Sequence, residues 1–344
     1  MRSIITRHAR ARVRITPLSQ LFPRLVLLCC FSLAYFANAA VTRPVTTSTS
    51  AAERSLMQGR IDEAIATLQS SVAANPADGQ AYLLLCRSYY AEEYQDQAVA
   101  ACESAVRSLP GSSQAYDWLG RALGMTASRA GPFAAFGLAL KVHAAFETAV
   151  HLDPRNAAAA NDLSEFYINA PGILGGGQDK ATGLADRVQN DLPQVAHRIR
   201  AMLAEKNKDY ATAEREFMAA VGDAKHPETL VDLGAFYMRR DQRIKAVEIL
   251  KQCLAVNRSD DASIVDVASI LNSRHLEPQL AEHTLQEYLR SSAKSDAAPV
   301  IRAEVMLGKM RAASGDIAGA KIEFEKALDL ASGYAPAKQA LSQL

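Results

Sequence analysis

A pattern centred on alanine recurs along the chain about every 34 residues. Two stretches show it most clearly: "QAYLLLCRSYYAEEYQDQAVAACESAVRSLP" (80–110) and "TLVDLGAFYMRRDQRIKAVEILKQCLAVN" (229–257). Each predicts an apolar helix, a polar turn, and a second helix that opens with alanine and carries an apolar residue four positions later. A unit this short cannot bury its apolar face alone, so the sequence predicts that successive units stack on one another.

The same register can be followed through eight units. The second helices carry a small apolar residue near their start, at Ala64, Ala98, Val142, Ala181, Ala213, Ala246, Ala281 and Ala320. Four positions later come Leu68, Cys102, Phe146, Ala185, Phe217, Leu250, Leu285 and Phe324. The first helices carry small residues at Cys86, Gly120, Ser164, Ala201, Gly234, Ala268 and Gly308. Positions i and i+4 share a helix face, and small residues there let neighbouring backbones approach closely.

This pattern resembles the tetratricopeptide repeat (TPR) family over essentially the whole chain after residue 50. The resemblance implies an all-α solenoid of about eight helix hairpins, which forms a right-handed superhelix and ends in a closing helix. The expected repeats span 51–78, 79–112, 113–156, 157–195, 196–226, 227–260, 261–297 and 298–332, with the closing helix at 334–344. The first repeat departs from the pattern, because its first helix (about 50–57) is weak.

Residues 1–39 contain six arginines and no acidic residue, and an apolar run fills positions 25–40. This run ends in the small-residue pattern Ala37-Asn38-Ala39. We expect a secretory signal peptide at 1–39, cleaved near Ala39, a flexible segment at 40–50, and a periplasmic or secreted mature protein. The alternatives are an uncleaved N-terminal anchor, for which the run is short, and a mitochondrial presequence.

Without residues 1–39 the chain has 32 basic and 37 acidic residues, a net charge of −5. This balance predicts no nucleic-acid partner and no bulk membrane binding after signal cleavage. The remaining cysteines are Cys86, Cys102 and Cys253, and all occupy helix-packing positions. Buried free thiols are the first expectation, and a Cys86–Cys102 disulfide is the alternative.

The stretch "APGILGGGQDKA" (170–181) has the glycines of a phosphate-binding loop but not its other residues. Gln178 and Asp179 occupy the positions where such a loop needs Lys and Ser or Thr, and no strand precedes the stretch. We interpret it as a long turn between the two helices of the fourth repeat. A second insert, "TASRAGPFAAFGLAL" (126–140), predicts that the second helix of the third repeat is longer than its siblings by one and a half to two turns.

Both inserts fall at the same edge of the predicted solenoid. Their apolar residues are Phe133, Phe136, Leu140, Ile173 and Leu174. One hypothesis is that Ile173 and Leu174 cover Phe133 and Phe136, with the glycines permitting a close approach. The other is an exposed apolar ridge that recruits a partner or lipid. The pair of inserts resembles secreted bacterial TPR proteins, a resemblance that implies no activity.

No motif for catalysis, a cofactor or a metal ion stands out. No histidine has a second histidine three or four residues away, and His143 and His151 are expected on a solvated helix face. We therefore expect no enzyme, no cofactor, no metal site and no catalytic residue. An enzyme with a non-local site is the rival, and it would need strongly perturbed titratable groups clustered in one pocket.

The TPR resemblance implies a concave groove lined by the first helices. The groove residues would be Gln80, Arg87, Tyr90, Gln114, Asp117, Arg121, Asn161, Glu165, Asn169, Arg198 and Arg239. These side chains suit an extended peptide or partner protein, so a non-enzymatic binding scaffold is the expected function. A membrane-anchored assembly factor that uses the insert edge is an alternative. Replacing Arg87, Asp117 and Arg121 together should therefore weaken partner capture without lowering the melting temperature.

Overall fold

The computed structural model describes residues 47–256, 262–273 and 275–344, and in these residues it contains helices and no strand. The predicted signal peptide and most of the predicted flexible segment lie outside the described residues. The helices are α1 Thr47–Met57, α2 Ile61–Ala74, α3 Gly79–Ala91, α4 Gln95–Ser108, α5 Ser113–Arg129, α6 Pro132–Leu152, α7 Ala157–Asn169, η1 Gly172–Leu174 (3-10), α8 Gln178–Val188, α9 Pro193–Lys206, α10 Tyr210–Val221, α11 Pro227–Arg239, α12 Arg243–Ala255, α13 Ala262–Ser273, α14 Pro278–Arg290, α15 Val300–Ala313, α16 Ile317–Leu330 and α17 Ala335–Leu341.

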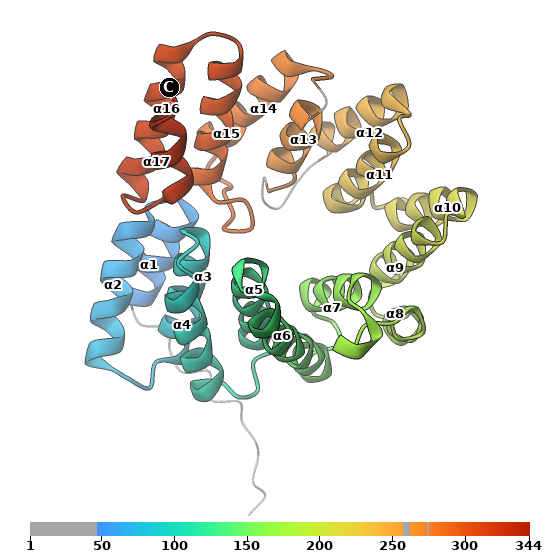
Figure 1. Cartoon of the computed structure of the whole chain (residues 1–344), viewed down its shortest axis with the longest axis horizontal. Helices are drawn as coiled ribbons and strands as arrows, with labels where there is room; N and C mark the ends of the chain where they lie inside the picture. Colours follow the sequence, from blue (N-terminus) through green and yellow to red (C-terminus); the bar gives the residue numbers. More distant parts are fainter. Residues whose placement is uncertain (1–46, 257–261, 274) are drawn as a thin grey trace, which may run out of the picture. The chain divides into compact units, whose positions relative to one another are not determined.

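Helices α1 to α16 pair into eight successive hairpins, and α17 packs against α15 and α16. This arrangement confirms the predicted all-α array with a closing helix. Residues 45–344 form one compact unit. Within it the hairpins follow one another around a ring, with the first helices of the repeats inside and the second helices outside (Figure 1).

The last hairpin returns to the first, so the array closes on itself. One continuous apolar core joins Ala52 and Leu56 of α1 to Phe324 of α16. The backbone N–H of Ser332 donates a hydrogen bond to Asp62 Oδ2 of α2, at 2.8 Å. The sequence pattern did not predict this closure, because it describes contacts between neighbouring repeats only.

In several hairpins a small residue on the first helix faces a larger one on the second. A Cβ atom added at Gly120 would lie 2.4 Å from the ring of Phe146, and one added at Gly308 would lie 2.4 Å from the ring of Phe324. Cys86 and Cys102 occupy the corresponding positions in the second repeat, and they form a buried disulfide. The expectation of three free thiols is therefore wrong, since facing positions bring these two together. Of the cysteines in the described residues, Cys253 alone is outside a disulfide.

We predict that Gly120→Ala lowers the free energy of unfolding by about 1–3 kcal/mol, because the new methyl group overpacks the contact with Phe146. Gly124, one turn later in the same helix, is a matched control, because a Cβ there meets no atom within 4 Å. Gly124→Ala should gain about 0.5–1 kcal/mol through lower backbone entropy in the unfolded chain. Urea unfolding of both variants measures the difference, and equal changes would contradict the packing account.

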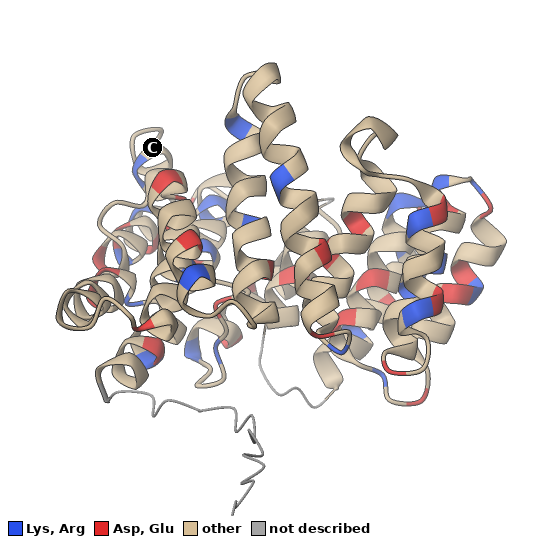
Figure 2. Cartoon of the chain, turned by 90° about the horizontal axis from the view of Figure 1, so that it is seen from below, with Lys and Arg blue, Asp and Glu red and all other residues tan. Residues whose placement is uncertain are grey.

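Helix α6 is the longest helix, with 21 residues against 11 to 14 in the other second helices. The predicted extension is confirmed, and α5 is lengthened with it to 17 residues, which the sequence did not predict. From Pro132 to Lys141 no residue of α6 is buried, and Val142 is the first that is. The α5–α6 hairpin therefore projects beyond its neighbours (Figure 2). Helix α6 is also long and apolar enough to cross a membrane, but its second half belongs to the solenoid core.

The predicted cover over the α6 extension is absent. Phe133 is 97% exposed and Ile173 is 77% exposed, so the hypothesis that Ile173 and Leu174 cover Phe133 and Phe136 is wrong. Phe133 and Ile173 therefore stay in solvent, whereas Phe136 and Leu140 are a little under half exposed and Leu174 is partly buried.

The glycine-rich segment between α7 and α8 instead packs on His143, which lies ten residues after Phe133 in α6. Gly175 has a φ angle of +95°, and a Cβ there would lie 2.6 Å from the His143 ring. The ring stacks on Phe166 with a centroid distance of 5.2 Å. The side chain of His143 is only 16% exposed, so the expectation of a solvated face is wrong for His143, whereas His151 is exposed as expected.

Candidate functional site

Arginines on the first helices bind acidic side chains one repeat away. Arg121 Nε of α5 donates to Asp162 Oδ2 of α7 at 2.6 Å. Arg198 Nε of α9 donates to Asp232 Oδ2 of α11 at 2.7 Å. A second nitrogen of Arg198, Nη2, donates to Glu165 Oε1 of α7, also at 2.7 Å. These ion pairs join first helices along the inner side of the ring.

The sequence contains a signal for these pairs that the motif analysis did not use. The partners of Arg198 are 33 and 34 residues away, and Arg239 pairs with Glu205 at a separation of 34. In a repeat of about 34 residues, opposite charges at this separation occupy neighbouring first helices. A search for such pairs would have found Asp232 and Glu205.

Two of the predicted groove residues are buried rather than solvated. Arg87 is 6% exposed, and its Nε donates to Asp296 Oδ2 at 2.6 Å, in the segment before α15. Asp117 is 2% exposed, and its pKa is raised to about 7 because burial, together with the nearby carboxylate of Asp162, outweighs the charge of Arg121. The expectation that Arg87, Asp117 and Arg121 can be replaced without lowering the melting temperature assumed solvated side chains. The burial of Arg87 and Asp117 contradicts that assumption.

Next to these charges lies the single tryptophan. Trp118 is 7% exposed and meets the ring of Tyr90 edge-on at 5.4 Å. The guanidinium of Arg121 lies 4.8 Å from the Trp118 ring centroid, a distance suited to a cation–π contact. Trp118 therefore anchors the α3–α5 contact and orients Arg121.

A pocket of about 340 Å³ opens on the first helices of three consecutive repeats. We call it the α7–α9–α11 pocket. Its lining consists of Ala157, Ala158, Asn161, Gln194, Val195, Arg198, His226, Glu228, Thr229 and Asp232. Of the predicted groove residues, Asn161 and Arg198 line it, and Glu165 lies beside it through its ion pair with Arg198. Sequence reasoning missed Gln194, Glu228 and Asp232.

The other predicted groove residues lie elsewhere. Gln80 and Gln114 are at the first turns of α3 and α5, and Asn169 is the last residue of α7. Arg239 is held by Glu205 at 2.7 Å. The structure therefore brings together three of the eleven predicted groove residues and leaves the other eight outside this pocket.

Charge in the pocket is fixed and slightly negative. Burial alone would lower the pKa of Arg198, but the negative charges of Asp232 and Glu165 have the larger effect. The pKa of Arg198 is therefore raised, and the guanidinium stays charged. Burial raises the pKa of Asp232, and Arg198 opposes that rise. Arg198 pairs with both Asp232 and Glu165, Glu228 also lines the pocket, and the charge of Arg239 acts on Asp232 as well. The pocket can accept hydrogen bonds from a cation and offers side-chain amides to a polar backbone.

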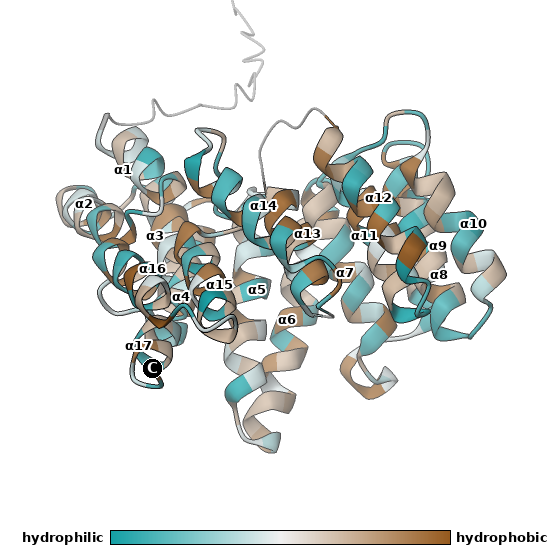
Figure 3. Cartoon of the chain, turned by 90° about the horizontal axis from the view of Figure 1, so that it is seen from above, coloured by the Kyte–Doolittle hydropathy of each residue, from teal (hydrophilic) through white to brown (hydrophobic). Residues whose placement is uncertain are grey.

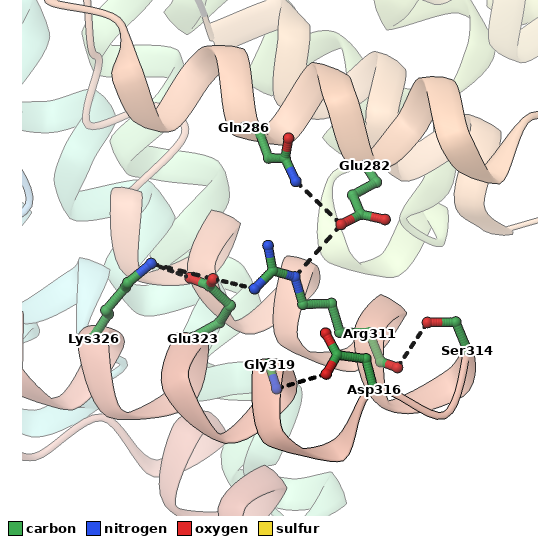
Figure 4. A network of polar contacts seen from close by, with 8 residues as sticks. All are labelled: Glu282, Gln286, Arg311, Ser314, Asp316, Gly319, Glu323 and Lys326. Atoms are coloured by element: carbon green, nitrogen blue, oxygen red, sulfur yellow. Dashed lines mark hydrogen bonds and ion pairs between the residues drawn. The ribbon is translucent and has the colours of Figure 1, made fainter.

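A second polar cluster lies between α14, α15 and α16, beside a pocket of about 380 Å³ (Figure 4). Arg311 Nη1 donates to Glu323 Oε1 at 2.7 Å, and Lys326 Nζ approaches Glu323 Oε2 at 2.9 Å. The Nε atom of Arg311 lies 3.5 Å from Glu282 Oε1. Each of these charges has an opposite charge beside it.

Glu304 lines the same pocket and is held as a neutral acid. Burial, a hydrogen bond to Glu323 and the charge of Glu323 raise the pKa of Glu304 to about 8. The enzyme alternative requires clustered titratable groups with shifted pKa values, and Glu304 and Glu323 are such groups. Glu304 is 7% exposed and Glu323 is 2% exposed, and both line the pocket. The cluster is built as a contact between α15 and α16.

Comparison with known proteins gives one family match. Residues 55–122 match the tetratricopeptide repeat model. A comparison with curated proteins found no match.

Several solved structures resemble the chain. Yeast Tom70 is 16% identical with a TM-score of 0.49, over 90% of this chain and 66% of Tom70. The thermophilic TPR protein TTC0263 of Thermus thermophilus is 18% identical with a TM-score of 0.44, over 65% of this chain and 97% of its own. A human IFIT1 dimer with m7Gppp-AAAA is 14% identical with a TM-score of 0.42, over 79% and 68% of the two chains. This chain thus spans just under two thirds of the length of Tom70.

The family match covers the second hairpin completely, and the same small-against-large packing recurs in the third and eighth hairpins. The spacing of the pattern, the succession of hairpins and the family match agree with one another. Residues 55–122 thus match the tetratricopeptide repeat family, and the other hairpins of the described chain repeat the same two-helix arrangement.

Proposed function

We propose that the chain is a non-enzymatic scaffold that binds an extended segment of a partner protein on its inner face. TPR proteins generally mediate protein–protein interaction. The observation that carries the proposal is the α7–α9–α11 pocket, which spans three repeats and combines fixed charges with side-chain amides. We further propose that the chain acts after export, as residues 1–39 predict.

An extended segment fits this pocket because its backbone needs hydrogen-bond partners at regular intervals. Asn161 and Gln194 place side-chain amides on α7 and α9, and each amide can both donate and accept. Arg198 is already held by Asp232 and Glu165, so ordering it costs little when the partner binds.

The charge of the pocket selects the kind of segment. Glu228 and Asp232 face the pocket, and Arg198 balances only one of the neighbouring carboxylates. A segment with a Lys or Arg side chain complements this surface. A nucleic acid would bring phosphates to a surface with surplus negative charge, so a protein partner is favoured.

We predict that Asn161→Ala weakens binding of selected peptides at least about tenfold, the effect of losing about 1.4 kcal/mol. Peptides of twelve residues selected on the purified chain from a displayed library serve as probes, and titration calorimetry measures their affinity. Asn169→Ala is the matched control, since Asn169 lies on the same helix but outside the pocket. Equal affinities for the Asn161→Ala and Asn169→Ala variants, or selected peptides without a basic residue, would contradict the proposal.

A further inference from the structure

The α5–α6 hairpin differs in charge from the rest of the chain. Between Asp117 and Glu147 there is no acidic residue, although 37 of the 344 residues are acidic. Arg129 is the last residue of α5 and Lys141 is the tenth residue of α6, so they flank the end of the hairpin. We call residues 129–141 the α6 tip.

One side of the α6 tip is an exposed apolar stripe. Phe133 is 97% exposed, Phe136 is 44% exposed and Leu140 is 42% exposed. Their spacing of i, i+3 and i+7 places them on one face of the helix. The ten helical residues from Pro132 to Lys141 extend about 15 Å beyond the first buried residue, at about 1.5 Å per residue.

A second apolar element projects from the same face of the molecule. Figures 2 and 3 show that the segment joining α7 to α8 projects in the same direction as the α5–α6 hairpin. This segment carries Ile173, which is 77% exposed. In the first turn of α8, Lys180 follows Asp179, and its Nζ donates to the carbonyl of Gly175. Two apolar points that project in the same direction suit a broad, flat surface, and Lys141 at the α6 tip favours a negatively charged one.

We propose that the α6 tip and Ile173 dock the protein on an anionic lipid bilayer. Aromatic and aliphatic side chains of a surface helix enter the boundary between headgroups and acyl chains to a depth of about 5–10 Å, and the α6 tip is long enough for this. Lys141 meets anionic headgroups directly, and Arg129 reaches them by exchanging its surface partner Glu93 for a headgroup. The net charge of −5 suggested no membrane binding, but it averages over an uneven distribution.

A protein partner fits the α6 tip less well than a bilayer does. The tip is convex and built largely of small residues, with Ala134, Ala135 and Gly137 beside the two phenylalanines. A protein would need a matching groove to bury it, whereas lipids rearrange around it. The inner-face pocket lies on other helices, so docking leaves it free for a peptide.

The test uses the chain as isolated from cells, with vesicles of phosphatidylcholine alone or with roughly one third phosphatidylglycerol. We expect flotation with the anionic vesicles and a loss of at least tenfold for Phe133→Ser/Phe136→Ser. Ile244→Ser is the matched control, because Ile244 is an 86% exposed isoleucine on α12, and it should leave flotation unchanged.

Hydrogen exchange localises the contact independently of the N-terminal residues. The amides of residues 129–141 should be protected by anionic vesicles only. Protection without vesicles that grows with protein concentration would show that a second copy of the chain covers the tip, and it would overturn the proposal. Equal flotation of the Phe133→Ser/Phe136→Ser and Ile244→Ser proteins, with unchanged exchange at the tip, would overturn it as well. All variants should keep the parental melting temperature, since the replaced side chains are exposed.

Discussion

Replacing Arg87 with methionine should lower the free energy of unfolding at pH 7 by about 3–5 kcal/mol, the cost of leaving a buried charge unpaired. The side chain of Arg87 is 7% exposed and that of Asp296 is 10% exposed, with 2.6 Å between Nε and Oδ2. The pair joins α3 to the segment before α15, so its loss should also loosen the closure between the first and last repeats. Denaturant unfolding measures the stability, and small-angle scattering measures the radius of gyration, which should increase.

Two variants separate ring closure from charge in general. Arg129→Met removes an arginine that pairs with Glu93 at the surface, and it should cost no more than about 1 kcal/mol. Arg87→Met/Asp296→Leu replaces the buried pair with apolar side chains and should recover much of the loss. If Arg87→Met and Arg129→Met have equal effects, the pair does not hold the ring closed.

Stability should fall as the pH rises from about 4.5 to about 8. Burial, together with a carboxylate neighbour, raises the pKa of Glu92 to about 7, of Asp117 to about 7 and of Glu304 to about 8. In this window the folded protein keeps protons that the unfolded chain has released, so the free energy of unfolding decreases with pH and levels off above 8. The shift of Glu92 from 4.5 to about 7 alone corresponds to about 3 kcal/mol.

Glu92→Gln should remove part of this slope and raise stability at pH 8. Glu92 is 2% exposed, and Asp62, Tyr94 and Lys338 are the charged or titratable groups around it. Glutamine keeps a hydrogen-bond donor toward Asp62 without a second negative charge. The neighbouring Glu93→Gln is the control and should leave the slope unchanged. Thermal melting of the two variants and the parent from pH 4.5 to 8.5 measures the slope of stability against pH. If both variants keep the slope of the parent, the raised pKa of Glu92 does not contribute to it.

The fold was predictable because each repeat follows local packing rules. The small residue on the first helix and the larger one on the second appear in the sequence at fixed spacing, as Gly308 and Phe324 do. The same spacing placed Cys86 and Cys102 opposite each other, although the sequence alone left the disulfide undecided. The long α6 was predictable from Pro132 and the apolar residues that follow it.

The closure and the ion pairs were harder to predict, because small rotations between repeats accumulate around the array. No local pattern brings Arg87 to Asp296, which is 209 residues away. Resemblance to the family selected Arg87 and Asp117 as binding residues, yet their burial gives them structural roles. The α7–α9–α11 pocket combines residues from three repeats, and Glu228 could not be selected without the curvature that brings them together.

The most direct test of the central claim is site-specific photo-crosslinking in cells of the native host. A photoreactive side chain at Gln194 or Glu228 would be compared with one at Glu103, an exposed residue of the outer helix α4. The account predicts that the two pocket positions capture the same extended segment of a partner protein, that the segment contains a basic residue, and that Glu103 does not capture it. Capture of that segment equally from Glu103, or no capture from either pocket position, would contradict an inner-face binding scaffold.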